Sequence, residues 1–122
     1  MDKDTVLKII QDFGRGLESH GVRIDRIVLF GSYATGTYHE GSDIDLVVVS
    51  DSFSGKGYWE RREVLWDVLY EIWKPIQATP VTIEEWEQED SMIVEFAKSG
   101  EVVYTGDGAD AKHHAVKEQR TQ

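Results

Sequence analysis

The chain has 122 residues, a length at which a single domain is expected. Its 13 Lys and Arg residues stand against 23 Asp and Glu residues, and the net charge of −10 argues against a general nucleic-acid binder, which needs basic surface. The absence of cysteine excludes disulfides, zinc–thiolate sites and thiol catalysis. Because the sequence has neither an apolar run of membrane-spanning length nor a signal-peptide start, we expect a soluble, cytoplasmic protein.

The first half of the chain predicts one helix and two strands. Apolar residues recur every three or four positions over 4–20, which indicates an amphipathic helix, with Asp4 as its N-cap and Gly21 as its stop. Residues 23–30 and 43–49 each end in a continuous apolar run, which is typical of a strand buried on both faces. The segment between the two strands is rich in glycine and hydroxyl residues and predicts a loop.

The second half predicts two more helices and two more strands. A helix is expected over 58–73, then a weaker strand over 76–81, in which Pro80 favours an edge position. Residues 82–85 match a capping box and predict a helix from about residue 83, and 101–105 predict a short last strand. In this last helix we expect inward-facing side chains at Trp86, Ile93, Phe96 and Ala97.

The order of these elements describes one compact α/β unit over residues 1–105. The remaining segment, 106–122, contains only three alanines and Val116 as apolar residues. Such a segment buries too little apolar surface to offset its ordering entropy, so we predict a disordered polar tail.

Two aspartates, Asp43 and Asp45, stand at the start of the second apolar strand. Side chains alternate along a strand, so both carboxylates point to the same side. Aspartate is a poor strand former, and a bound Mg²⁺ would compensate for the pair, since hard cations take carboxylate oxygens together with substrate phosphates. The plainer alternative is that Asp43 caps a turn while Asp45 is solvated.

The first strand leads directly into Gly31 and Ser32. Glycine allows a backbone to approach a ligand closely, and a serine at this point caps a short helix whose free N–H groups make an anion site. Alone, the pair equally fits an ordinary turn between two strands.

Together, Gly31-Ser32, ten intervening residues and Asp43-x-Asp45 resemble the signature of the DNA-polymerase-β-like nucleotidyltransferases. The resemblance is greatest to the minimal nucleotidyltransferase group and covers about residues 4–105. It implies a small mixed β-sheet flanked by helices.

The resemblance also implies roles for individual residues. Gly31 and Ser32 would hold the phosphates of a nucleoside triphosphate, with ATP as the first expectation. Thr35 would add one hydroxyl hydrogen bond at a position where many relatives have arginine. Asp43 and Asp45 would be the catalytic residues and would hold two Mg²⁺ ions, which stabilise the attacking and leaving oxygens.

One position departs from the family pattern. Active members carry a third carboxylate on the strand after the long helix, and the matching residue here is Gln77. A neutral amide is no general base and is a weaker metal ligand. Glu71 is a candidate replacement, although a solvated helix face explains it more simply.

Two functions therefore stay open. The first is a Mg²⁺-dependent nucleotidyltransferase that acts on an acceptor hydroxyl, which the resemblance places on a protein, with a HEPN-domain partner in a toxin–antitoxin pair. The second is a module that binds nucleotide or partner without catalysis, as an antitoxin lacking the third carboxylate would. The acidity argues against a long nucleic-acid substrate.

Several other residues have simpler explanations. His39 fits an exposed loop position, and His113 and His114 lie in the tail. Trp73 and Trp86 fit the core or its edge. Trp66 lies off the apolar face of the helix predicted over 58–73 and is a candidate for a partner surface.

Overall fold

The computed structural model describes residues 1–89 and 91–106. The helices are α1 (Lys3–Ser19), α2 (Ser32–Thr35), α3 (Tyr58–Ile72), α4 (Ile83–Gln88) and α5 (Met92–Ala97), with a 3-10 turn, η1, at Asp51–Phe53. The strands are β1 (Ile24–Phe30), β2 (Ile44–Ser50), β3 (Ile76–Val81) and β4 (Glu101–Thr105).

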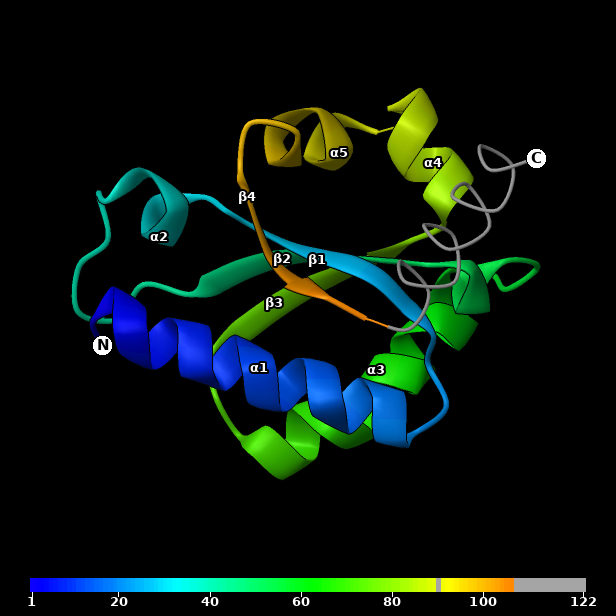
Figure 1. Cartoon of the computed structure of the whole chain (residues 1–122), viewed down its shortest axis with the longest axis horizontal. Helices are drawn as coiled ribbons and strands as arrows, with labels where there is room; N and C mark the ends of the chain where they lie inside the picture. The colour runs from blue at the N-terminus through cyan, green and yellow to red at the C-terminus, as the bar shows by residue number, and fades with distance from the viewer. Residues whose placement is uncertain (90, 107–122) are drawn as a thin grey trace, which may run out of the picture.

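The four strands form one mixed sheet in the order β3-β2-β1-β4. Strand β1 runs antiparallel to β2 and β4, whereas β2 and β3 are parallel. Helices α1 and α3 cover one face of the sheet, and α4 and α5 lie on the other (Figure 1). The predicted mixed sheet flanked by helices is confirmed, and so is the edge position of the strand that contains Pro80.

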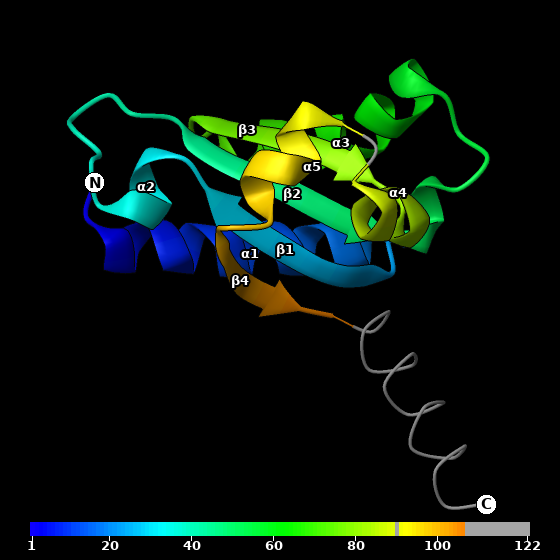
Figure 2. The same cartoon turned by 90° about the horizontal axis from the view of Figure 1, so that it is seen from above.

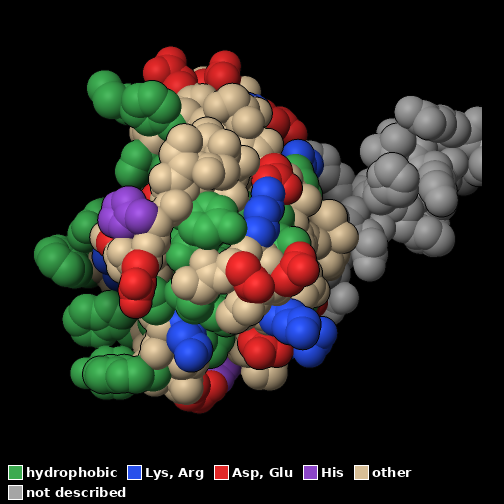
Figure 3. All heavy atoms as spheres, turned by 90° about the vertical axis from the view of Figure 1, so that its left-hand side faces the viewer, with side chains coloured by type: hydrophobic (Ala, Val, Ile, Leu, Met, Phe, Trp, Pro, Cys, Tyr) green, Lys and Arg blue, Asp and Glu red, His purple; other side chains and the backbone are tan. Residues whose placement is uncertain are grey.

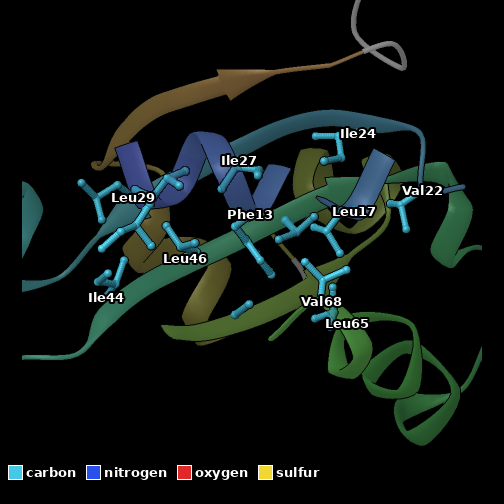
Figure 4. Close-up of a cluster of buried hydrophobic side chains, with 14 of the residues drawn as sticks. Phe13, Leu17, Val22, Ile24, Ile27, Leu29, Ile44, Leu46, Leu65 and Val68 are labelled. Carbon is cyan, nitrogen blue, oxygen red and sulfur yellow. The ribbon is translucent and has the colours of Figure 1, made fainter. Parts of the chain in front are cut away.

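The apolar run of β2 supplies both halves of the core. Ile44, Leu46 and Val48 join the cluster beneath α1 and α3, part of which Figure 4 shows around Phe13. Alternate residues, among them Val47, join a second cluster with Trp86 beneath α4 and α5. This two-sided burial is the reason for the unbroken apolar sequence.

The start of the first helix differs from the expectation. Its N-cap is Asp2 and not Asp4, because the Asp2 carboxylate accepts a hydrogen bond of 2.9 Å from the backbone N–H of Thr5. Asp4 lies in the first turn, where its charge still favours the helix N-terminus.

The predicted late helix is two helices. Glu89, with φ +53°, ends α4, and the Ser91 side chain caps α5 by accepting from Val94 N–H. The break turns a different face of α5 to the core, so Val94 is buried while Ile93 and Phe96 are 41% and 63% exposed. The inward orientation expected for these last two residues is therefore wrong, whereas Trp86 and Ala97 are buried as expected.

Helix α3 matches its predicted range but not every predicted orientation. Leu65 and Val68 are buried, and Trp66 is 56% exposed, as its place off the apolar stripe predicted. Trp73, expected at the core or its edge, is 78% exposed. Its left-handed backbone, φ +54°, ends the helix. Trp73 stands seven residues after Trp66, so helical geometry places both residues on the same outer face.

Most of the predicted tail lies outside the described residues. Only its first residue, Gly106, is described, and it packs so closely on Ile24 that a Cβ would lie 2.8 Å from the Ile24 carbonyl oxygen. In the described ranges, 1–89 and 91–106, no helix is both long and apolar enough to cross a bilayer.

The capping box of α4 joins this helix to α3. Thr82 Oγ1 accepts from Glu85 N–H at 3.1 Å, and Glu85 Oε1 accepts from Thr82 N–H at 2.8 Å and from Arg61 Nη1 at 2.6 Å. The hydrogen bond from Arg61, followed by that from Thr82, holds the pKa of Glu85 below its ordinary value of 4.5.

We predict that Glu85→Gln lowers the free energy of unfolding by about 1 kcal/mol at pH 7, the usual size of a capping contribution. A lowered pKa means that the stabilisation is complete above pH 4.5 and is lost as the pH falls through the folded-state pKa. Urea unfolding at pH 7 and pH 3 measures this difference. Glu84→Gln in the same turn is the control, and an equal loss at both pH values would contradict the prediction.

Candidate active site

The two aspartates lie at the N-terminal end of β2. Asp43 immediately precedes the strand and is exposed, and Asp45 is half-buried. By strand alternation, Asp45 shares its face with Val47, which α4 and α5 cover. In register, it lies between Phe30, the last residue of β1, and Gln77 of β3.

The turn at Gly31 meets the Asp45 carboxylate. Gly31 has φ +73°, which a residue with a Cβ rarely adopts, and a Cβ there would lie 2.4 Å from Asp45 Oδ2. The positive φ therefore favours glycine, and any Cβ at this position would force the Asp45 carboxylate to move. The Asp45 carboxylate thus lies beside the glycine turn that precedes it in the sequence motif.

Helix α2 follows the turn at once. Gly31 is its N-cap, and the Gly31 carbonyl oxygen accepts from the N–H groups of Ala34 and Thr35. The short helix was expected, but the capping role assigned to Ser32 is wrong, since Ser32 is the first helical residue. The N–H groups of Ser32 and Tyr33 have no acceptor within a helix that begins here, because the first turn lacks preceding carbonyls.

Thr35 lies at the far end of α2. Its hydroxyl is exposed and forms hydrogen bonds with Thr37 Oγ1 at 2.8 Å and with the Ser32 carbonyl at 3.4 Å. To donate its single hydroxyl hydrogen to a phosphate oxygen, as expected, Thr35 would have to give up the bond that it donates to the Ser32 carbonyl. His39 is an exposed loop residue, as expected, and its ring nitrogen lies 2.8 Å from the carbonyl oxygen of Glu40.

A residue that sequence analysis passed over holds the loop before the aspartates. Ser42 is buried, its hydroxyl accepts from the His39 N–H at 2.9 Å, and its own N–H donates to the His39 carbonyl at 3.0 Å. This reciprocal turn fixes the chain immediately before Asp43. The Gly41-Ser42-Asp43 sequence, a glycine followed by two turn-forming residues, is a signal from which this turn could have been predicted.

Gln77 occupies the third position beside the aspartates. It pairs in register with Asp45, and its Nε2 donates to Asp43 Oδ2 at 3.0 Å. Glu71, the candidate replacement, instead lies 3.6 Å from His20 Nε2 on α1. In the residues that the structure describes, no group of three or more His, Asp or Glu side chains is arranged to hold a metal.

The electrostatics of the pair favour a cation. Burial, and to a smaller extent the negative charge of Asp43, raises the pKa of the Asp45 carboxyl above its ordinary value of 3.8. The two carboxylates offer oxygen ligands that suit a hard divalent cation such as Mg²⁺, and the neutral amide of Gln77, whose Nε2 faces Asp43, stands beside them. The residues present therefore fit this metal.

We predict that Asp45→Asn stabilises the metal-free protein at pH 7. Because the native state binds the Asp45 proton more tightly than the unfolded chain, native stability falls as the pH rises from 3.8 through the raised pKa. The gain in melting temperature from the substitution should therefore be present at pH 7 and absent below pH 3.8. Thermal unfolding in EDTA tests this, with the exposed Glu40→Gln as a control of equal charge change.

Comparison with known proteins bears on this geometry. The family model described as the nucleotidyltransferase domain matches residues 7–101, from within α1 to the start of β4. Two candidate protein adenylyltransferases of Methanocaldococcus jannaschii are similar in sequence. One is 34% identical over 87 residues, covering 69% of this chain and 58% of the relative. The other is 51% identical over 45 residues, covering 36% and 45%. The chain thus spans about half the length of these curated relatives.

Solved structures share the fold. A candidate nucleotidyltransferase from Sulfolobus solfataricus superposes with a TM-score of 0.68 at 16% identity, over 84% of this chain and 83% of that one. A toxin–antitoxin complex with AMP-PNP gives 0.53 at 16% identity, over 99% and 91%. A toxin–antitoxin mutant with two Asp-to-Glu changes one residue apart gives 0.52, also at 16% identity, over 99% and 91%. With a family match over most of its length and this shared fold, the chain belongs to the nucleotidyltransferase domain family.

Proposed function

We propose that this chain is a Mg²⁺-dependent nucleotidyltransferase that moves a nucleoside monophosphate, in the first instance AMP from ATP, to an acceptor hydroxyl. The observation that carries the proposal is the contact of the Asp45 carboxylate with the backbone of Gly31. This contact brings a metal-binding carboxylate beside a turn that begins a helix, where phosphate oxygens are well bound. A fold without a nucleotide has no need of that combination.

Each residue then has a defined part in the reaction. Gly31 permits close approach of the triphosphate, and the N–H groups of Ser32 and Tyr33 donate to its phosphate oxygens. Asp43 and Asp45 hold the metal, and a second ion would be held more weakly because Gln77 offers only a neutral amide. Bound Mg²⁺ supplies charge neutralisation on the phosphates and on the leaving pyrophosphate.

The transfer is an in-line displacement. The acceptor oxygen forms a bond to the α-phosphorus, the bond from that phosphorus to the leaving oxygen breaks, and pyrophosphate departs. Gln77 cannot take the proton of the acceptor hydroxyl, so this proton passes to solvent or to a base on the acceptor. Positioning and charge neutralisation therefore provide most of the catalysis.

We also propose that the acceptor is a protein. The sequence relatives are candidate protein adenylyltransferases, and two of the solved structures with the same fold are toxin–antitoxin complexes. The mutant complex carries two changed aspartates at the same spacing as Asp43 and Asp45. The resemblance to the minimal nucleotidyltransferase group favours a HEPN-domain protein in a toxin–antitoxin pair as that partner.

A second candidate function rests on Gln77. Its hydrogen bond to Asp43 places a neutral amide where a third carboxylate would stand, and it occupies one carboxylate oxygen. A module that binds nucleotide and a partner without transferring the nucleotide is compatible with that arrangement.

We predict that the protein, incubated with Mg²⁺, α-labelled ATP and a HEPN-domain candidate partner, transfers label to that partner. Asp43→Asn and Asp45→Asn should each reduce the transfer on the order of 10³-fold, the scale of losing an electrostatic stabiliser. Glu40→Gln is the control variant. Calorimetric ATP binding without transfer, across metals and acceptors, would favour the non-catalytic module.

We predict that Gln77→Glu, which adds a carboxylate of nearly unchanged shape, raises the transfer rate on the order of 10²-fold, the contribution typical of a general base. Initial rates with saturating ATP measure this effect. Gln88→Glu, the same change at an exposed position of α4, should leave the rate unchanged. A rate unaltered by Gln77→Glu would show that the third position has no part in the reaction.

A further inference from the structure

The outer face of α3 carries exposed aromatic side chains. Trp59, Trp66 and Tyr70 are 71%, 56% and 71% exposed, and helical geometry places them within about 40° of arc. Trp73, just beyond the helix and 78% exposed, continues the line, with its ring centroid 6.0 Å from that of Tyr70. We call these four residues the aromatic stripe, which is about 20 Å long at 1.5 Å per residue.

The fold does not require the aromatic stripe. Leu65 and Val68 on the opposite side of α3 already pack into the core. Figure 3 shows hydrophobic side chains standing out from the molecule along the edge on which β3 and α3 lie. Exposed aromatic groups gathered on one helix are rare on a protein that has no partner, and Trp and Tyr are enriched in the centres of interfaces.

The aromatic stripe is also shaped to receive side chains. Trp66 lines two open, shallow hollows of about 500 Å³ and about 270 Å³. The larger is lined by Trp66, Leu69, Tyr70, Trp73, Lys74 and Pro75, and the smaller by Trp59, Arg62, Glu63 and Trp66. Two hollows along a helix suit apolar side chains that project one or two turns apart from a second helix.

The charges beside the aromatic stripe define the partner. One flank carries an exposed acidic row of Glu60, Glu63, Asp67 and Glu71, which helical geometry places on the same side. A second copy of this chain would bring like rows and two strongly negative molecules together, which opposes self-association. Residues 107–122 contain only three alanines and Val116 as apolar residues, too small for the larger hollow.

We propose that the aromatic stripe is the docking surface for a basic amphipathic helix of a partner protein. Large apolar side chains of that helix, spaced at i, i+3 or i+4, and i+7, would fill the two hollows that Trp66 lines. Its Lys and Arg residues would face the acidic row. This docking is independent of the nucleotide chemistry proposed above.

The docked helix would end close to the candidate active site. Pro75, in the wall of the larger hollow, accepts a hydrogen bond of 2.8 Å from the N–H of Ile44, the residue between the two aspartates. A protein bound on the aromatic stripe therefore has its nearest approach to Asp43 at this end of α3. If the nucleotide site proves inactive, the docking surface remains to be judged by binding alone.

The test uses the full chain and three labelled synthetic peptides of 18 residues. The first has Leu and Lys in an amphipathic helical pattern, the second has the same residues scrambled, and the third has Glu in place of Lys. Fluorescence anisotropy at physiological salt should give binding of the first peptide at least tenfold tighter than that of the other two. Equal binding of the first two, or of the Lys and Glu peptides, overturns the proposal.

Matched variants locate the binding. Trp66→Ser, and separately Glu63→Lys combined with Asp67→Lys, should weaken binding of the first peptide at least tenfold. Phe96→Ser on α5 and Glu84→Lys combined with Glu87→Lys on α4 make the same kinds of change elsewhere and should leave it unaltered. Circular dichroism checks that each variant is folded. If the Trp66→Ser variant is not folded, a Trp66→Gln variant takes its place.

Two further measurements separate other occupants. Light scattering that shows a dimer converted to a monomer by Trp66→Ser would overturn the proposal in favour of a second copy. Sedimentation with phosphatidylcholine vesicles that depends on Trp66 would overturn it in favour of a lipid surface. The proposal is supported if the protein is a monomer, does not sediment with the vesicles, and binds the first peptide more tightly than the other two.

Discussion

The contact between the Asp45 carboxylate and the Gly31 backbone is the constraint on which the candidate site depends. Antiparallel pairing of β1 with β2 sets Phe30 opposite Asp45, so the residue after Phe30 must accommodate a carboxylate where a Cβ would otherwise stand. Glycine avoids that clash and readily adopts the positive φ of the turn. The phosphate-binding geometry proposed for α2 follows from the same register, because α2 begins at the next residue.

Strand β2 contributes to both the hydrophobic core and the candidate site. Its middle is buried on both faces, beneath α1 and α3 on one side and α4 and α5 on the other, and this burial anchors the sheet. Its first residues extend past the cover of α4 and α5, so Asp45 is only half-buried. Figure 2 shows α5 lying over the middle of the sheet, with α2 at one end and α4 at the other. The pKa of Asp45 is raised because partial burial disfavours the charged carboxylate, and a bound cation would offset this effect.

The parallel pairing of β2 with β3 determines which side chain lies beside the two aspartates. The register sets Gln77 beside Asp45, and the amide reaches across to Asp43. Two carboxylates therefore stand beside one neutral amide, and proton transfer from an acceptor has no base on this strand. In the proposed transfer, solvent or a base on the acceptor would have to take this proton.

Local sequence patterns determined most of the secondary structure and the pairing of motif residues. The periodicity of α1 and α3 follows the 3.6-residue repeat of a helix, and the unbroken apolar runs of β1 and β2 reflect burial on both faces. The spacing from Gly31 to Asp43 and Asp45 can also be read directly from the sequence. The family followed from those residues because their spacing is long and specific. Counting back from the capping box of the next helix pointed to Gln77 or a close neighbour, and in the structure Gln77 does lie beside the two aspartates.

What only the tertiary structure decided is which face each element turns to its neighbours. The break at Glu89 exposed Phe96 and buried Val94. Periodicity cannot show a one-residue change of backbone conformation, although such a change rotates every later side chain. The hydrogen bond from Gln77 to Asp43 and the 2.4 Å limit at Gly31 likewise depend on strand register, which is settled by contacts between residues far apart in the chain.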